Sequence, residues 1–327
     1  MKLYLGLAKN AAPYQTRIFA DIESKLIDLN LAYAACLAQR HGNVSGSYEL
    51  ASFYFPSTIA AFLDRTEEGR KALDEVVTFA RQCGLDNLRG PADEKVVYAP
   101  SDIRLLPPLQ NPEKSFVIGF SDQARIEAMP KAELPTGFYK LPRTFVTSGA
   151  PIVWPKFSEE LDADACLAIV IGKAGRRIPP ERTLDYVAGV TLLIDVTARD
   201  INRREGLTTN NLLGKNFPSS TSLGPALWLT NSRKDLEALE VDLSVNSVSK
   251  QRFTLRHCVF SVDQIIARWS ILGIKPGDFF AIGASMALQA GRLQSPVPVT
   301  LGSTICCSSP AAGELRHEIV SARGVRR

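Results

Sequence analysis

The feature that most constrains the fold is the segment 161–172, which is polar at its start and apolar to its end. Asp162, Asp164 and Cys166 recur at every second position, so in a strand all three side chains point to one face. Charged groups beside an apolar run are costly to bury unless a metal, a cation or a substrate faces them. The alternative is that the aspartates simply end a strand in solvent. A second segment of this kind is 193–200, where Asp195 lies inside another apolar run.

Length and composition predict an ordinary globular protein with a large core. The chain has 327 residues, 45% of them hydrophobic, which suggests about two domains. The net charge of +4 is spread along the chain, so neither a nucleic-acid nor a membrane partner is expected. Six scattered cysteines without a CxxC pair favour a reducing cytoplasm, and no run reaches the length of a membrane span. Only three histidines limit schemes that depend on imidazole.

Residues 1–105 are predicted to form a small α+β domain. Strands are expected at 2–7 and 17–22, followed by helices at 29–40, at 56–63 and from residue 66 to a stop at Cys83-Gly84. The last helix carries an apolar stripe that includes Leu73, Val76 and Val77. The proline-rich segment 105–109 closes this domain.

Residues 106–327 are predicted to form a second, mainly β domain, because short β-type runs are broken by glycine and proline. One helix interrupts them, with Ser261 and Gln264 as a capping box and Gly273 as its stop. The fold class is therefore α+β, mainly β. The expected strands lie at 115–118, 145–153, 166–171, 190–196, 241–245, 279–283 and 297–303.

Several short motifs occur in a fixed order. They are DIRLLPP (102–108), FYKLP (138–142), PIVWP (151–155), IVIGK (169–173), DYVAG (185–189), DVTARD (195–200), GKNF (214–217) and the Gly224-Pro225 pair. As a set, over roughly residues 100–285, they resemble the fumarylacetoacetate hydrolase family. The resemblance implies a mixed β-roll catalytic domain behind a small N-terminal domain, assembled as a homodimer. It also implies magnesium or manganese and a small 2-oxo-acid or β-dicarbonyl substrate.

The metal ligands implied by the resemblance are Asp164, Cys166 and Asp195. The family has glutamates at the first two positions, so one carboxylate is shortened and one is replaced by a thiol. A soft thiol is a poor ligand for these hard cations, which prefer oxygen. Asp122 is a candidate substitute ligand, or else a loop-capping aspartate. The expectation is Mg²⁺ or Mn²⁺ at a weakened site, or no metal.

The catalytic residues implied by the resemblance are also altered. The family's water-activating histidine is absent from the segment 118–127, where Arg125 and Glu127 are the remaining candidates. Arg125 stays protonated and cannot act as a base. Lys215 and Arg199 are retained. Lys215 can hold a substrate carboxylate or stabilise an enolate, or it can form an ion pair with Asp164 or Asp195 that replaces the metal charge.

The rest of the predicted pocket is less defined. The polar segment 202–206 is predicted as a loop over the pocket, where Arg203 or Arg204 can meet an anionic ligand, or as a solvated surface loop. Cys166 is a nucleophile or, as the plainer interpretation, a small filler. The substrate-binding candidates are Arg203, Arg204, Phe120, Cys166 and Ser285.

Three hypotheses for the function follow. The first is an enzyme that acts on a 2-oxo acid or β-dicarbonyl compound by enolate chemistry such as decarboxylation, dehydration or tautomerisation. The second is a metal-free biosynthetic enzyme that catalyses a condensation or cyclisation on the same fold. The third is a non-catalytic ligand-binding relative. Hydrolytic carbon–carbon cleavage is disfavoured, because three family features are missing together: the histidine, one glutamate and the Thr-Gly-Thr-Pro loop, whose place is taken by Ile282-Gly283-Ala284-Ser285.

Overall fold

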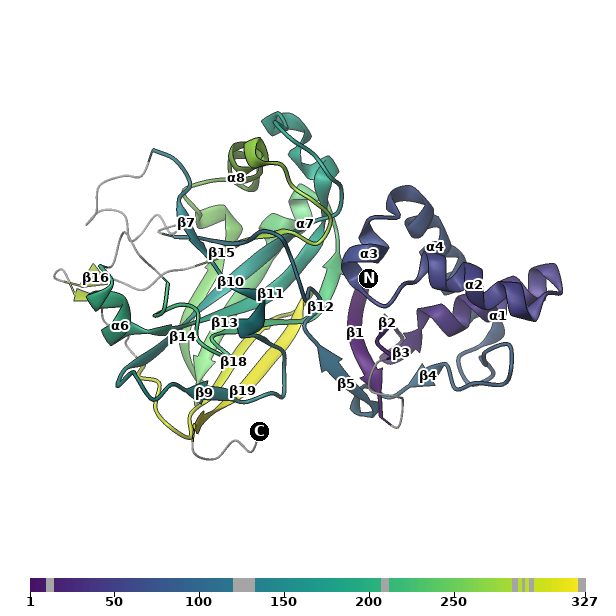
Figure 1. Ribbon diagram of the computed structural model, residues 1–327, viewed down its shortest axis with the longest axis horizontal. Helices are drawn as coiled ribbons and strands as arrows, with labels where there is room; N and C mark the ends of the chain where they lie inside the picture. Colours follow the sequence, from purple (N-terminus) through teal and green to yellow (C-terminus); the bar gives the residue numbers. More distant parts are fainter. Residues whose placement is uncertain are drawn as a thin grey trace.

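The computed structural model describes residues 1–9, 15–119, 133–206, 212–283, 288–289, 292–293 and 297–322. Figure 1 shows a smaller part, in purple and blue, that carries α1 to α4, beside a larger part built mostly from strands. The predicted class, α+β and mainly β, is confirmed. Within the described ranges no helix is both long and apolar enough to cross a membrane.

The smaller part packs helices on an antiparallel set of strands. α1 begins after Asp28, whose carboxylate accepts hydrogen bonds from the N–H groups of Asn30 and Leu31, and ends at Gly42 with a φ of 67°. The predicted apolar stripe of α4 is buried as expected. The elements are β1 (Lys2–Ala8), β2 (Arg17–Ile22), β3 (Lys25–Asp28), α1 (Leu29–His41), α2 (Val44–Tyr54), α3 (Ile59–Leu63), α4 (Thr66–Cys83), β4 (Val97–Tyr98) and β5 (Ile103–Leu106).

One helix of this part, α2, was not predicted. It packs on α1, yet only Ser47 and Ala51 among its residues are buried. The large apolar side chains Val44, Leu50 and Phe53 are exposed, so α2 shows no clear separation of an apolar and a polar face, which is the signal that a sequence-based prediction uses.

The larger part is organised around a long curved sheet. Its order is β4-β3-β2-β1-β12-β11-β10-β15-β6-β7, with β5 beside β1 and β8 beside β12. β1 pairs with β12, with Leu3 opposite Leu227, so the strands of the N-terminal part extend the same sheet. The added strands are β6 (Ser115–Ile118), β7 (Gly137–Tyr139), β8 (Phe145–Val146), β10 (Leu161–Ile171), β11 (Val187–Ala198), β12 (Thr221–Leu229) and β15 (Phe279–Gly283).

A five-stranded sheet of order β14-β13-β18-β19-β9 forms a second layer, and β16 and β17 make a small pair. The capping box of Ser261 and Gln264 at the start of α8 is confirmed. The remaining elements are β9 (Ile152–Trp154), α6 (Arg199–Arg204), α7 (Arg233–Ala238), β13 (Glu240–Val245), β14 (Val248–Thr254), α8 (Val262–Trp269), β16 (Leu288–Gln289), β17 (Arg292–Leu293), β18 (Thr304–Ser309) and β19 (Gly313–Ser321). Short 3-10 helices occur at Pro100–Asp102, Pro142–Thr144, Pro180–Tyr186, Leu255–His257 and Ser270–Leu272.

Two strand predictions were wrong in detail. The strand expected at 297–303 starts later, as β18, because Pro298 cannot donate to a ladder and Gly302, with a φ of 80°, forms a turn. The strand expected at 145–153 is split into β8 and β9 by a turn at Gly149, whose φ is 89°. In both cases turn residues overrode an apolar run.

β10 lies between the two cores of the molecule. Its odd-numbered residues, such as Leu167 and Ile169, pack in the core shared with the second sheet. Its even-numbered residues Cys166, Ala168 and Val170 pack in the core that includes the N-terminal helices. This division follows from the alternation of side chains along a strand, and it places Asp162 and Asp164 on the face of Cys166.

Candidate functional site

The predicted aspartates meet on β10 and β11. The two strands are antiparallel, and Asp164 lies directly opposite Asp195 in the register. Asp162, Asp164 and Asp195 are at most 5% exposed, so the alternative in which the aspartates end a strand in solvent is wrong. We call these three residues with Cys166 the carboxylate ledge. Every buried carboxylate of the ledge needs a partner, because an isolated buried charge is strongly disfavoured.

Arg199 joins two of the ledge carboxylates. Its Nε and NH2 atoms donate to Asp162 Oδ2 at 2.8 and 2.6 Å, and NH2 also donates to Asp164 Oδ2 at 2.7 Å. Burial alone would lower the pKa of Arg199, but Asp164 and Asp162 outweigh it and raise the pKa above its usual value. Arg199 is therefore a fixed cation, placed there because β11 turns into α6 at this residue.

β14 supplies two further partners that the sequence did not single out. Lys250 Nζ pairs with Asp162 Oδ1. Gln251 Nε2 donates to Asp164 Oδ1 at 2.8 Å, while Gln251 Oε1 accepts from the N–H of Ala165 at 2.8 Å. β15 pairs with β10 only from Cys166 onward, so Gln251 satisfies a strand-edge donor that β15 does not reach.

Asp195 is held by two lysines. Lys215 Nζ donates to Asp195 Oδ2 at 2.5 Å and to Thr197 Oγ1 at 2.7 Å, and it lies 4.8 Å from the centre of the Phe138 ring. Lys140 Nζ donates to Asp195 Oδ1 at 2.8 Å and to the carbonyl oxygen of Lys215. Burial would raise the pKa of Asp195, yet the two lysines hold it below its usual value.

Lys140 was not predicted as a site residue, although it stands in the FYKLP motif. Its side chain is fully buried. Burial lowers the pKa of Lys140, and Asp195 opposes that effect. The signal that could have found it is a lysine between apolar residues directly after a short strand, where a buried charge without a partner would be unfavourable.

Cys166 fits the role of filler better than that of nucleophile. The side chain is buried, and burial followed by Asp195 and Asp164 raises the pKa of its thiol well above the usual value. A Cβ atom placed on Gly283 would lie 2.5 Å from the sulfur, so the thiol fills the space left by that glycine. A neutral, enclosed thiol is a weak nucleophile and a weak ligand.

The other predicted site residues divide into two groups. Arg203 and Arg204 lie on α6, so the predicted loop at 202–206 is wrong for most of its length. Both arginines are exposed, and Arg203 pairs with Glu160 at 2.5 Å. The remaining candidates, Phe120, Asp122, Arg125, Glu127 and Ser285, lie outside the described residues.

The described donors do not fit a hard divalent cation. Both oxygens of Asp164 and both oxygens of Asp195 already accept hydrogen bonds from side chains. Cys166, the next residue of β10 on this face, offers only a neutral thiol. Three ledge carboxylates are surrounded by four cationic side chains, so the cluster has no excess negative charge to attract a metal. Within the described ranges no group of three or more His, Cys, Asp or Glu side chains could hold a metal ion.

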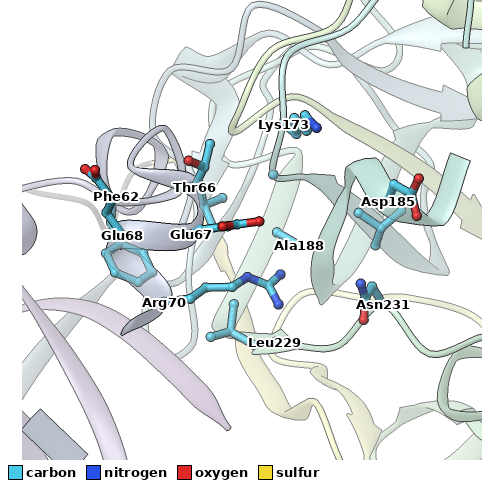
Figure 2. Close-up of a pocket in the computed structure, with 13 residues that line it drawn as sticks. Phe62, Thr66, Glu67, Glu68, Arg70, Lys173, Asp185, Ala188, Leu229 and Asn231 are labelled. Carbon is cyan, nitrogen blue, oxygen red and sulfur yellow. The ribbon is translucent and has the colours of Figure 1, made fainter. Parts of the chain in front are cut away.

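A separate cavity of about 600 Å³ lies where the smaller part meets the larger one. Gly172 lines it, eight residues along from Asp164, so it lies roughly 26 Å from Asp164 along the chain. Figure 2 shows Arg70 reaching from α4 toward Leu229. The charged residues that line this cavity are exposed and of both signs. The carboxylate ledge, whose charges are buried, is therefore the stronger candidate for the functional site.

Two packed sheets with a buried row of carboxylates and cations across the two central strands define a β-roll protein of the fumarylacetoacetate hydrolase type. Residues 118–320 match the family described as "Fumarylacetoacetate (FAA) hydrolase C-terminal". This chain belongs to the fumarylacetoacetate hydrolase family.

Several relatives of known name are similar to this chain. Oxaloacetate tautomerase fahd2, mitochondrial, of Xenopus laevis is 32% identical over 228 residues, which cover 68% of this chain and 70% of the relative. Oxaloacetate tautomerase YisK of Bacillus subtilis (strain 168) is 31% identical over 257 residues, which cover 75% of this chain and 83% of the relative. The predicted enolate-type chemistry agrees with these names, because a tautomerase of oxaloacetate interconverts its keto and enol forms.

A solved structure is similar in fold. Maleylpyruvate hydrolase from Sphingobium sp. SYK-6, in complex with manganese (II) ion and pyruvate, superposes with a TM-score of 0.69 at 19% identity. The match covers 98% of this chain and 99% of that chain. At this identity the likeness extends to the fold alone.

Proposed function

We propose that this protein is an enzyme that converts a small 2-oxo acid or β-dicarbonyl compound through an enol or enolate, by tautomerisation or decarboxylation. The observation that carries the proposal is Lys215, an ammonium group held by Asp195 and Thr197 beside the Phe138 ring. A fixed cation in a site of low dielectric stabilises a developing enolate oxygen without reorganising.

The exposure of the four cations supports Lys215 as the residue that meets the substrate. The side chains of Lys140 and Lys250 are 0% exposed, whereas those of Lys215 and Arg199 each keep 7%. We assign Lys215 to the enolate oxygen and Arg199 to the organisation of the ledge. Arg203 and Arg204 are proposed to attract the anionic substrate from the surface of α6.

The names of the relatives support tautomerisation over hydrolysis. The family's hydrolytic route needs a histidine beside the site, and residues 118–137 contain none. Tautomerisation and decarboxylation need an electrophile more than activated water. We keep decarboxylase and lyase activities as proposals of the same enolate chemistry, on a substrate that the assay must identify.

The test is a turnover assay with the purified protein on oxaloacetate, other 2-oxo acids and a β-diketo acid, following the loss of the enol absorbance. We expect Lys215→Met to lower kcat by about 10²- to 10³-fold, the loss typical of one oxyanion donor. Lys173→Met, at an exposed lysine just after β10, is the matched control and should retain full activity.

Two other results would change the assignment. If Lys215→Met retains full activity, Lys215 is not the electrophile. If no compound of these classes turns over and one binds, the protein is a ligand-binding relative.

Assembly and location stay predictions from the sequence. We propose a homodimer, on the resemblance of the whole motif set to the family, and a cytoplasmic location. Light scattering of the purified protein and fractionation of cells that express it would test the two statements.

A further inference from the structure

We infer that the site works with fixed side-chain cations in place of the divalent metal that the family pattern implies. The inference rests on the proposed function, because it concerns how the same ledge stabilises an enolate. It begins from the disagreement between the donors present on β10 and β11 and the requirements of Mg²⁺ or Mn²⁺.

The first step concerns Asp195. Lys140 occupies Oδ1 at 2.8 Å and Lys215 occupies Oδ2 at 2.5 Å. A metal bound by this carboxylate would have to share an oxygen with one of these buried ammonium groups or displace it. Sharing places two cations in close contact in a site of low dielectric, and displacement leaves an ammonium group buried without its counter-ion, so both are unfavourable.

The second step concerns Asp164. Its Oδ2 accepts from Arg199 and its Oδ1 accepts from Gln251, which is itself fixed by the N–H of Ala165. Arg199 also holds Asp162, so releasing Asp164 for a metal would disturb a second buried carboxylate. Both oxygens of Asp164 are therefore hydrogen-bonded to side chains of the protein itself.

The third step concerns Cys166, which stands where the family has its third carboxylate. The thiol is enclosed against Gly283 and carries no charge, so it neither attracts a hard cation nor completes its oxygen shell. The charge that such a ligand would have added is missing, while four cationic side chains are present.

Together these contacts give the ammonium of Lys215 the electrostatic role of a Lewis acid. Asp195 and Thr197 fix its position, and Lys140 fixes Asp195 and the backbone carbonyl of Lys215. In decarboxylation the electrons of the broken carbon–carbon bond move toward the oxygen as CO2 leaves, and in tautomerisation the carbon-bound proton passes to solvent. In either case the resulting enolate oxygen would accept a hydrogen bond from Lys215 Nζ.

The test is manganese binding by the wild-type protein after treatment with a chelator. Mn²⁺ is titrated by calorimetry, and the free ion is followed by its electron paramagnetic resonance signal. We expect no saturable binding with a dissociation constant below about a millimolar. Binding of one Mn²⁺ per chain below that value would overturn the inference if Asp195→Asn or Asp122→Asn abolishes it and the exposed-site control Asp185→Asn does not.

Turnover supplies an independent readout. The rate on any substrate found in the assay should be the same, within about twofold, in EDTA and in added Mn²⁺ or Mg²⁺. A protein that binds no Mn²⁺ and turns over no oxo acid refutes the proposed function while supporting the metal-free ledge. A protein that turns over only with bound Mn²⁺ refutes the ledge inference and retains the proposed function.

Discussion

Lys140 and Asp195 form a fully enclosed ion pair at 2.8 Å, with the lysine on the segment after β7 and the aspartate on β11. The lysine also donates to the carbonyl oxygen of Lys215, so one ammonium group fixes both the ledge carboxylate and the backbone of the proposed catalytic lysine. Lys140 can be buried because Asp195, 55 residues later in the sequence, supplies its counter-charge.

Replacing Lys140 with methionine should destabilise the protein by about 3–5 kcal/mol, the usual effect of removing one partner of a buried pair. Asp195 would keep only Lys215 as a cationic partner. The free energy of unfolding in urea measures the effect. Lys173→Met, at an exposed lysine, should change it by no more than about 0.5 kcal/mol. If the two substitutions change the free energy of unfolding equally, the ion pair of Lys140 with Asp195 does not stabilise the fold.

Arg199→Lys should not be a conservative change. The guanidinium donates to Asp162 and Asp164 at once, whereas a single ammonium cannot reproduce that fork. We expect a loss of about 1.5–3 kcal/mol of stability, the value for a hydrogen bond to a buried charge. Arg182→Lys, in an exposed pair with Asp185, is the control and should be near neutral. Wild-type stability of Arg199→Lys would contradict the bridging role.

Asp28 should make stability depend on pH below neutrality. Burial raises the pKa of this helix-capping carboxyl to about 6 from its ordinary value of 3.8. Folding therefore favours the protonated carboxyl. The stability that Asp28 contributes is fully present below pH 3.8 and is lost as the pH rises through about 6. Asp28→Asn keeps a capping side chain and removes the titration. Between these pH values the unfolding free energy of the variant should depend less on pH than that of the wild type. Asp86→Asn, at an exposed site, should keep the pH dependence of the wild type.

Cys166 should be unreactive in the native protein. Its raised thiol pKa and its enclosure against Gly283 predict that iodoacetamide alkylates it only after unfolding, while the half-buried Cys83 reacts first. Mass spectrometry of peptides after timed alkylation measures both. Cys166→Ser should retain activity. A folded Cys166→Ser variant without activity would instead identify a nucleophile.

Much of the local structure was predictable because it depends on neighbours in the sequence. The stripe of α4 and the Ser261–Gln264 box are periodic or capping signals, and both are confirmed. α2 was missed because apolar side chains also lie on its exposed side, so its sequence does not separate an apolar from a polar face. The strand predicted at 297–303 failed because a proline and a left-handed glycine break it.

The sequence by itself determined the family, the fold class and the row of polar side chains on one face of β10, because alternation along a strand and a fixed motif order are both written in the chain. Only the tertiary structure decided what faces that row. Lys250 and Gln251 reach it from β14 and Lys140 from the segment after β7, and Lys215, which the sequence offered as a partner of Asp164 or Asp195, pairs with Asp195. Which cation neutralises which buried carboxylate depends on distances across strands and sheets, and those distances exist only in the folded chain.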